Sequence, residues 1–301
     1  MSHNINSLHS DYLEDLEIGL GRSAKTVENY DRYLRAFFKH QNIEEVADIT
    51  QDSVRMFRRH LNQSGDGASL ATQNYYLIAI RQFLRYLARR DIAALSPEKV
   101  QLAKLPDRDI DVLYPEEVDR LLAIAPPVKK PLQALRDQAL LHTLFSTGMR
   151  ISEAIRLNRD DLRPHSNEVT VRGKGNKVRV VFLSDEAYSR LNTYLEKRQD
   201  IDPALFVRHK ANPTKEDNLR ITPRSAQRMI KLYAAAAGIT KDITPHTLRH
   251  SFATDLLANG ADVRQVQQLL GHASITTTQV YTHFTDVQLR SIHERFHRKK
   301  N

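Results

Sequence analysis

Five residues of this 301-residue chain are of the types that can cleave a phosphodiester covalently. They are Arg150, His246, Arg249, His272 and Tyr281. An arginine stays charged and its planar fork can hold two phosphate oxygens, so a pair can stabilise the negative charge that attack on phosphorus builds. A tyrosine hydroxyl has an unperturbed pKa of about 10 and needs a nearby base, which a histidine can supply. The set predicts strand cleavage by a tyrosine nucleophile.

The remaining requirement of this chemistry is a proton for the sugar oxygen that leaves, best delivered by a mobile lysine or histidine. No cluster of aspartates and glutamates resembling a two-metal site accompanies the five residues, so we expect neither a metal ion nor another cofactor. Each residue alone has an ordinary interpretation. Tyr281, one of 11 tyrosines, could be a packing residue, and His272 could end a helix. The five residues occur in one ordered series, and each has matching local context. Five independent ordinary interpretations are therefore hard to maintain.

Several segments carry a resemblance to the tyrosine recombinases, close to the bacterial Xer type and to phage and transposon integrases. Residues 147–153, TGMRISE, resemble the family's first arginine box, and residues 245–254, PHTLRHSFAT, resemble its histidine–arginine box. Residues 269–274 with residues 277–283 resemble its nucleophile segment, and residues 171–177, VRGKGNK, resemble the hairpin that carries its catalytic lysine. The resemblance covers nearly the whole chain.

The resemblance implies a role for each of the five residues. Arg150 and Arg249 clamp the scissile phosphate, and His272 completes the phosphate site. His246 moves the proton of the tyrosine. Tyr281 attacks phosphorus and gives a 3′-phosphotyrosyl link with a free 5′ hydroxyl. Because that link keeps the phosphoester bond energy, strands rejoin without ATP.

Two further residues have roles that the resemblance implies. Lys174, at the tip of the hairpin, is the general acid for the leaving sugar oxygen, with Lys177 as its rival. Glu153 lies three residues after Arg150 and orients the site, unless it forms only a surface salt bridge.

The resemblance implies a site-specific DNA recombinase that cuts and rejoins double-stranded DNA through a Holliday junction. The implied assembly is a tetramer on two DNA sites, with a second recombinase or an accessory DNA translocase as further partners. Chromosome dimer resolution, mobile-element integration or excision, and DNA inversion all stay open. Two other functions are weighed: a type IB topoisomerase, and a DNA-binding factor whose site is vestigial.

The tail over residues 286–296 has an apolar side formed by Val287, Leu289, Ile292 and Phe296. Such a tail can pack on its own domain. The resemblance favours docking onto a neighbouring subunit, which would exchange C-terminal segments between protomers.

Composition sets the broad class. The formal net charge of +9, from 45 lysines and arginines against 36 acidic residues, suits a polyanionic partner. The chain has no cysteine, which excludes disulfides, thiolate metal sites and cysteine nucleophiles. No apolar run approaches the roughly 20 residues that span a bilayer, and the first residues lack a secretory signal. We expect a cytoplasmic, nucleoid-associated protein without membrane contact.

The apolar pattern predicts a mainly α-helical fold with a small antiparallel sheet. Four helices are expected in the first third, with Ser23, Thr50 and Ser69 opening the second, third and fourth. Residues 96–111 contain Pro97 and Pro106 and are expected to link two domains, unless they form a surface loop within one. We place the domains at residues 1–106 and 107–301. The resemblance implies a SAM-like core DNA-binding domain and a catalytic domain that form a C-shaped clamp on DNA.

In the second domain, the pattern predicts helices over residues 115–123, 132–147, 185–197, 223–236, 245–258, 263–270 and around 275–281. Strands are expected over residues 168–171 and 178–182, joined by a glycine-containing turn rich in cations.

Contacts with DNA are expected from polar and basic residues near helix starts and at the hairpin, because such positions bind phosphate. The candidates are Lys25, Thr72, Gln73, Asn74, Arg81, Lys177, Arg220, Arg224 and Arg228. The alternative for each is an ordinary solvated face.

Overall fold

The computed structural model describes residues 4–63, 67–106, 111–163, 166–173, 178–209, 214 and 218–271. The chain divides into two compact units, Met1–Arg108 and Asp109–Asn301. The domain limits assigned from the sequence stay a prediction. The helix expected around residue 275 and the apolar tail lie outside the described residues. Among the described helices, none is long and apolar enough to cross a membrane.

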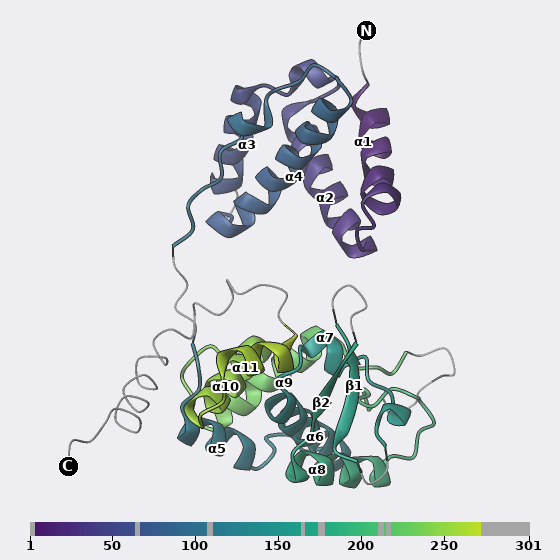
Figure 1. The fold of residues 1–301 in the computed structure, drawn as a ribbon, viewed down its shortest axis with the longest axis vertical. Helices are drawn as coiled ribbons and strands as arrows, with labels where there is room; N and C mark the ends of the chain where they lie inside the picture. Colours follow the sequence, from purple (N-terminus) through teal and green to yellow (C-terminus); the bar gives the residue numbers. More distant parts are fainter. Residues whose placement is uncertain are drawn as a thin grey trace, which may run out of the picture. The chain divides into compact units, whose positions relative to one another are not determined.

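The first unit contains four α-helices (Figure 1). They enclose a core rich in aromatic side chains. The helices are α1 (Ile5–Glu14), α2 (Ala24–Gln41), α3 (Gln51–Gln63) and α4 (Leu70–Arg89). Helix α4 packs against the other three. The rings of Tyr12 and Phe83 lie 5.4 Å apart, and those of Phe37 and Phe57 lie 5.2 Å apart, both edge to face. Such aromatic pairs bury large areas, so these side chains hold the helices together.

The expected helix starts of this unit are confirmed. The hydroxyls of Ser23 and Ser69 each accept a hydrogen bond from the backbone N–H three residues on. Thr50 accepts in the same way from the Ser53 N–H at 3.1 Å, directly before α3. These bonds satisfy N–H groups that a helix start otherwise leaves without a partner.

The stretch expected to link the domains, residues 96–111, is partly fastened to the first unit. Val100 is buried in its core, after a short 3₁₀ turn at Pro97–Lys99. The Asn74 amide donates to the Ala103 carbonyl and accepts from the Ala103 N–H, both at 2.9 Å. Arg81 Nε donates to the Val100 carbonyl at 3.0 Å. The beginning of the expected linker therefore packs against α4.

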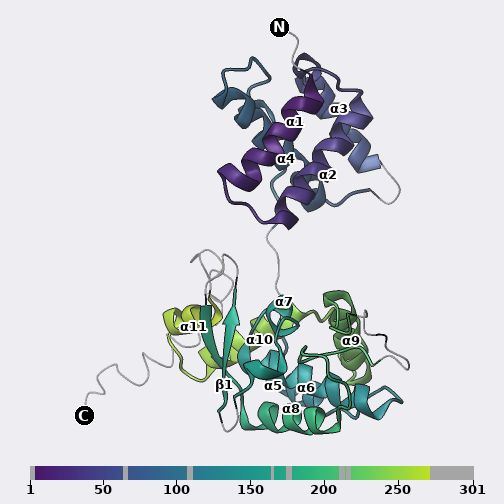
Figure 2. The same ribbon diagram turned by 90° about the vertical axis from the view of Figure 1, so that its right-hand side faces the viewer.

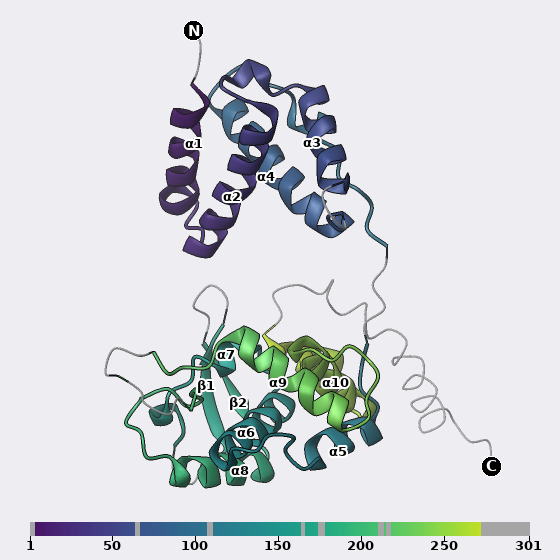
Figure 3. The ribbon, with the colours of Figure 1, turned by 180° about the vertical axis from the view of Figure 1, so that it is seen from behind.

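The second unit surrounds helix α6 with other helices and a two-stranded sheet. Helix α6 packs against α5, α8 and α10, and against β2. The elements are α5 (Pro115–Ala123), α6 (Pro131–Thr147), α7 (Ile151–Ala154), β1 (Glu168–Arg172), β2 (Val178–Phe182), α8 (Asp185–Lys197), α9 (Pro223–Ala236), α10 (Pro245–Ala258) and α11 (Val263–Leu270). The short helix α7 contacts α9 (Figure 3). The predicted class, mainly α with a small antiparallel sheet, is confirmed.

The two strands pair antiparallel with Val171 opposite Arg179, and β2 contacts α11. Figure 2 shows α11 beside the sheet. Side chains alternate between the faces of a strand. Val178, Val180 and Phe182 are exposed, whereas Val181 is buried in the core. The exposed side chains form an outer apolar stripe. Arg179 shares the inner face with Val181.

We predict that Asn74→Ala destabilises the first unit. The buried amide is the partner of both polar groups of Ala103, and leaving buried groups unpaired costs about 1–3 kcal/mol. Urea unfolding of the full chain with amide hydrogen exchange in α4 measures the change. Lys25→Ala is the control, because its ion pair with Glu28 is exposed and contributes little. Equal stability of the two variants would contradict the assignment.

Candidate active site

The described part of the site is built around the buried side chain of Arg249, in α10. Only 4% of this residue is exposed. Its Nη1 donates to the Gly148 carbonyl and its Nη2 to the Leu270 carbonyl, both at 2.7 Å. Gly148 caps the end of α6, and Leu270 is the last residue of α11. The last carbonyls of a helix lack partners within it and favour a cation, so one guanidinium binds two helix ends.

Gly148 provides the turn that leads from α6 to Arg150. Its φ is +58°, in the left-handed region that favours glycine. A Cβ there would lie 2.2 Å from Phe252 Cδ1 and 2.9 Å from Leu270 Cδ2. The backbone therefore approaches α10 and α11 as closely as it does only because this residue has no side chain.

Arg150 is held by a pairing with Glu153 at the start of α7. The Arg150 backbone N–H donates to Glu153 Oε2 at 2.9 Å, and its Nη1 donates to Oε1 at 3.0 Å. A second arginine binds the same carboxylate: Arg179 Nη1 donates to Oε1 at 3.0 Å and Nη2 to Oε2 at 2.7 Å. Glu153 is buried, so it does not form the surface salt bridge that was the alternative.

The charge of Glu153 follows from these bonds. Burial by itself would raise the pKa of this carboxyl, because a low dielectric disfavours the ion. The hydrogen bonds and charge of Arg179, with those of Arg150, outweigh burial and lower the pKa to about 2. Glu153 is therefore ionised near pH 7, and it accepts hydrogen bonds from both arginines.

His246 is the second residue of α10, which Thr244 opens by accepting from the Thr247 N–H at 3.2 Å. Neighbouring protein atoms displace water from the imidazole, and this loss of hydration lowers the pKa of His246. The positive charges of Arg249 and Arg150 lower it further. Its imidazole is therefore neutral near pH 7 and can accept a proton. The structure thus brings together three of the five predicted residues.

His250, one turn along α10, is partly buried. Burial, with His246 and Arg249, lowers the pKa of His250 to about 4. It is neutral near pH 7 as well, so the positive charge of this cluster comes from its arginines.

Four predicted residues, Lys174, Lys177, His272 and Tyr281, lie outside the described residues, and their roles stay predictions. The chain on each side of them is described. Arg179 is two residues after Lys177, and Leu270, bound by Arg249, is two residues before His272.

Four of the eight described candidates for DNA contact make partly buried hydrogen bonds within the protein. Gln73 donates to Ala68 and Asn62, and Asn74 and Arg81 bind the segment around Val100. Arg220 donates to the carbonyls of Ile155 and Leu157 and to the Asn158 side chain. These contacts give the four side chains a structural role, and DNA contact stays a prediction for them.

The other four candidates are exposed: Lys25, Thr72, Arg224 and Arg228. Arg224 and Arg228 are four residues apart on α9, so they share one face of that helix.

Arg179 is a site residue that sequence reasoning missed. The predicted strand over residues 178–182 is confirmed, but the sequence pattern does not identify its arginine as a site residue. A signal existed: a lone arginine in the middle of an apolar strand must find acceptors if it is buried.

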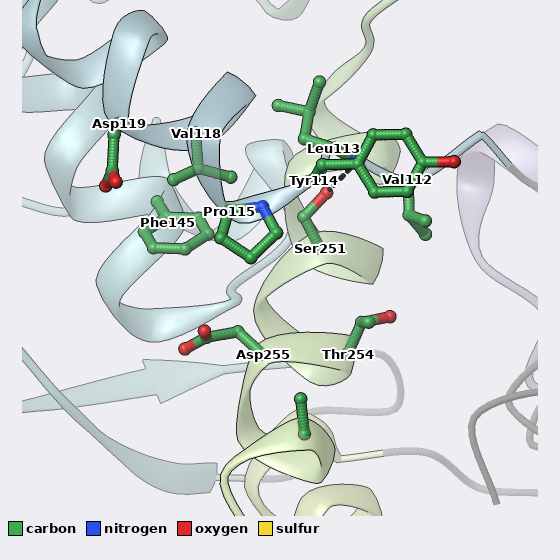
Figure 4. Close-up of a pocket in the computed structure, with 11 residues that line it drawn as sticks. Val112, Leu113, Tyr114, Pro115, Val118, Asp119, Phe145, Ser251, Thr254 and Asp255 are labelled. Carbon is green, nitrogen blue, oxygen red and sulfur yellow. Dashed lines mark hydrogen bonds between the residues drawn. The ribbon is translucent and has the colours of Figure 1, made fainter. Parts of the chain in front are cut away.

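A cavity of about 200 Å³ lies beside α10, between the segment that precedes α5 and the side chain of Phe145 (Figure 4). The Ser251 hydroxyl at its edge accepts from the Leu113 N–H at 2.8 Å and so fastens that segment to α10. Its lining is largely apolar and contains none of the residues predicted to do chemistry. The cavity is separate from the cluster around Arg249.

Comparisons with protein families match both units. Residues 111–287 match the phage integrase family, and residues 10–91 match the N-terminal SAM-like domain of phage integrases. The tyrosine recombinase XerD of Oceanobacillus iheyensis is 37% identical over 299 residues, which cover 95% of this chain and 97% of that protein. The XerD of Staphylococcus saprophyticus is 37% identical over 300 residues, covering 97% and 99%.

Solved structures give the same fold. The XerA recombinase is 29% identical with a TM-score of 0.54, covering 98% of this chain and 99% of that one. XerH bound to difH in a pre-cleavage complex is 22% identical with a TM-score of 0.70, covering 94% and 83%. At that identity the likeness to XerH shows the fold alone.

We predict that Gly148→Ala disrupts the site, whereas Gly238→Ala does not. Both glycines have positive φ, so each alanine pays about 1–2 kcal/mol in backbone strain. Nothing lies within 4 Å of a Cβ at Gly238, whereas at Gly148 the clash with Phe252 adds about 1–3 kcal/mol. Thermal melting should show the larger drop for Gly148→Ala. Equal drops would mean that the close approach does not matter.

Proposed function

The chain belongs to the phage integrase family of tyrosine recombinases, and we propose that its described site binds the scissile phosphate of a specific DNA sequence for cleavage and rejoining. The observation that carries the proposal is the buried guanidinium of Arg249, held at two helix ends with Arg150 and His246 beside it. The resemblance found in the sequence is confirmed by these matches.

The proposed chemistry needs donors that are in place before charge develops. A phosphodiester carries one negative charge, and attack adds a second on the non-bridging oxygens. Arg150 and Arg249 face that charge, and hydrogen bonds within the protein fix both before DNA arrives. Preorganised donors of this kind are usually the largest catalytic term.

We propose that the bonds change as follows. The Tyr281 oxygen attacks phosphorus while its proton passes to His246. The bond from phosphorus to the 5′ oxygen breaks, and Lys174 gives that oxygen a proton. The product is a 3′-phosphotyrosyl link and a free 5′ hydroxyl, and attack by a partner strand's hydroxyl reverses the step.

The partners follow from the same proposal. Among proteins of this fold, a lambda integrase tetramer has been described bound to a Holliday junction. For this chain we propose a tetramer that recombines two duplexes through such a junction, acting on DNA in the nucleoid. The tail over residues 286–296 would dock on a neighbouring subunit. The sequence of its target DNA would distinguish chromosome resolution from integration or excision. So would the identity of any second recombinase or DNA translocase that acts with it.

We propose that α9 contributes a DNA-contacting surface through Arg224 and Arg228. Both are exposed on one face, near the start of a helix where the dipole favours anions. In the first unit, Lys25 and Thr72 lie in the first turns of α2 and α4 and would contact phosphates in the same way.

We predict that Tyr281→Phe abolishes covalent attachment to DNA and leaves binding unchanged. The removed hydroxyl is the proposed nucleophile and is not needed to hold phosphate. Genome-wide footprinting would supply the target site, and a nicked suicide duplex carrying it would trap the covalent complex on a denaturing gel. Tyr75→Phe, at an exposed tyrosine of α4, is the control.

A covalent complex that persists in Tyr281→Phe would remove that tyrosine from the mechanism. Relaxation by the wild type of a plasmid without the site would instead favour a topoisomerase.

We predict that Arg249→Lys lowers the cleavage rate far more than DNA affinity. Lysine keeps the charge but lacks the planar fork that binds two carbonyls, so the rate should fall about 10²–10³-fold, as when one preorganised donor is lost. Single-turnover cleavage and gel-shift titration measure the two effects, with Arg190→Lys on α8 as the control. Equal losses in cleavage and binding would contradict the role.

A further inference from the structure

We propose that Arg179 is a positioning residue of the cleavage site, which holds Glu153 and the end of α11 so that Arg150 is presented to the scissile phosphate. The proposal rests on the proposed strand cleavage and deepens it. Arg179 itself need not touch DNA.

The geometry of Arg179 is that of an anchor. Its Nη1 and Nη2 bind both oxygens of Glu153, and its Nε donates to the Leu269 carbonyl at 3.1 Å. Two parallel bonds from an arginine to a carboxylate are strong and fix orientation, and a lysine cannot reproduce them. The guanidinium therefore joins the strand that follows Lys177 to α7 and to the end of α11.

The exposures of the two arginines on Glu153 assign them different roles. The side chain of Arg179 is 14% exposed, whereas that of Arg150 is 32% exposed. Glu153 lies between them and uses both oxygens for both partners. Arg150 is thus the arm that remains accessible to a ligand. Arg179 is the inner support, and it acts through Glu153.

The Nε group of Arg179 positions the end of α11, from which the chain continues to His272. Arg179 binds the Leu269 carbonyl and Arg249 binds the next one, that of Leu270. Gly271 follows with φ +66°, and a Cβ there would lie 3.1 Å from Arg179 Cδ. Two consecutive carbonyls are therefore held by two arginines from different elements, which fixes where this chain leaves α11.

The ionisation of Glu153 gives the proposal a distinctive readout. Glu153 faces Arg150, directly before α7, and Arg179 of β2, and the charge of Arg150 also acts on His246 of α10. Without Arg179, burial is opposed by fewer hydrogen bonds, so the pKa of Glu153 rises from about 2. Its protonated form accepts poorly from Arg150. As the pH drops through the raised pKa of Glu153, the variant should lose more cleavage than the wild type, because protonation of His246 affects both proteins alike.

The test measures cleavage and binding of a nicked duplex carrying the footprinted site, at several pH values between 5 and 8. At pH 8, Arg179→Ala should cleave about 10²-fold more slowly, as expected when a reacting group is misplaced, with affinity changed less than about threefold. The loss should grow at pH 5. Arg179→Lys keeps the charge, so it should restore the pH profile but not the full rate. Arg190→Ala is the control.

A double-mutant cycle separates positioning from a general structural effect. If Arg179 acts through Glu153, adding Arg179→Ala to Glu153→Gln should slow cleavage by less than about threefold, because coupled residues are not additive. Multiplied losses would overturn the proposal, as would an unchanged pH profile or equal losses in binding and cleavage. If Arg179→Ala unfolds at a lower temperature than the wild type, the pH profile of cleavage by Arg179→Lys becomes the deciding measurement. Absence of covalent complex in the wild type would instead refute the proposed function.

Discussion

A buried guanidinium bound to two helix ends is the constraint on which the rest of the site depends. Burying the charge of Arg249 is costly unless hydrogen bonds replace its water, and the carbonyls of Gly148 and Leu270 do so. Carbonyls carry only partial negative charge, so these two bonds solvate the cation without neutralising it. The same two bonds bring the end of α6 and the end of α11 together. Positive potential and chain geometry are therefore fixed by one side chain.

The second constraint is a carboxylate shared by two arginines. Glu153 binds both Arg150 and Arg179. Glu153 therefore orients Arg150 and is itself oriented by Arg179. Three arginines against one carboxylate leave a net charge of +2 in this group. That value equals in size the total of two negative charges that a phosphodiester reaches when attack adds a second. Supporting contacts of this kind decide whether a site is held closely enough to act.

Much of this arrangement could be predicted from the sequence. The helix starts at Ser23 and Ser69 followed from capping residues, and the local motifs identified Arg150, His246 and Arg249 as partners across the chain. Arg179 could not be placed by pattern. The apolar residues Val178, Val180 and Phe182 alternate with it, so a period of two puts the arginine on the solvent face. The structure has the reverse: Arg179 lies on the inner face, where the Glu153 carboxylate and the Leu269 carbonyl accept its hydrogen bonds. Asn74 and Arg81 likewise looked like surface groups, because no local pattern shows that residues 100–103 return to α4.

The inverted strand has a consequence for how the purified protein behaves. With Arg179 turned inward, the outer face of β2 presents Val178, Val180 and Phe182 to water. At low ionic strength the net charge of +9 keeps molecules apart, but added salt screens that repulsion while leaving the apolar stripe unchanged. The apolar stripe on the outer face of β2 is thus the counterpart of the arginine that turns inward to the catalytic cluster, on the opposite side of the same strand.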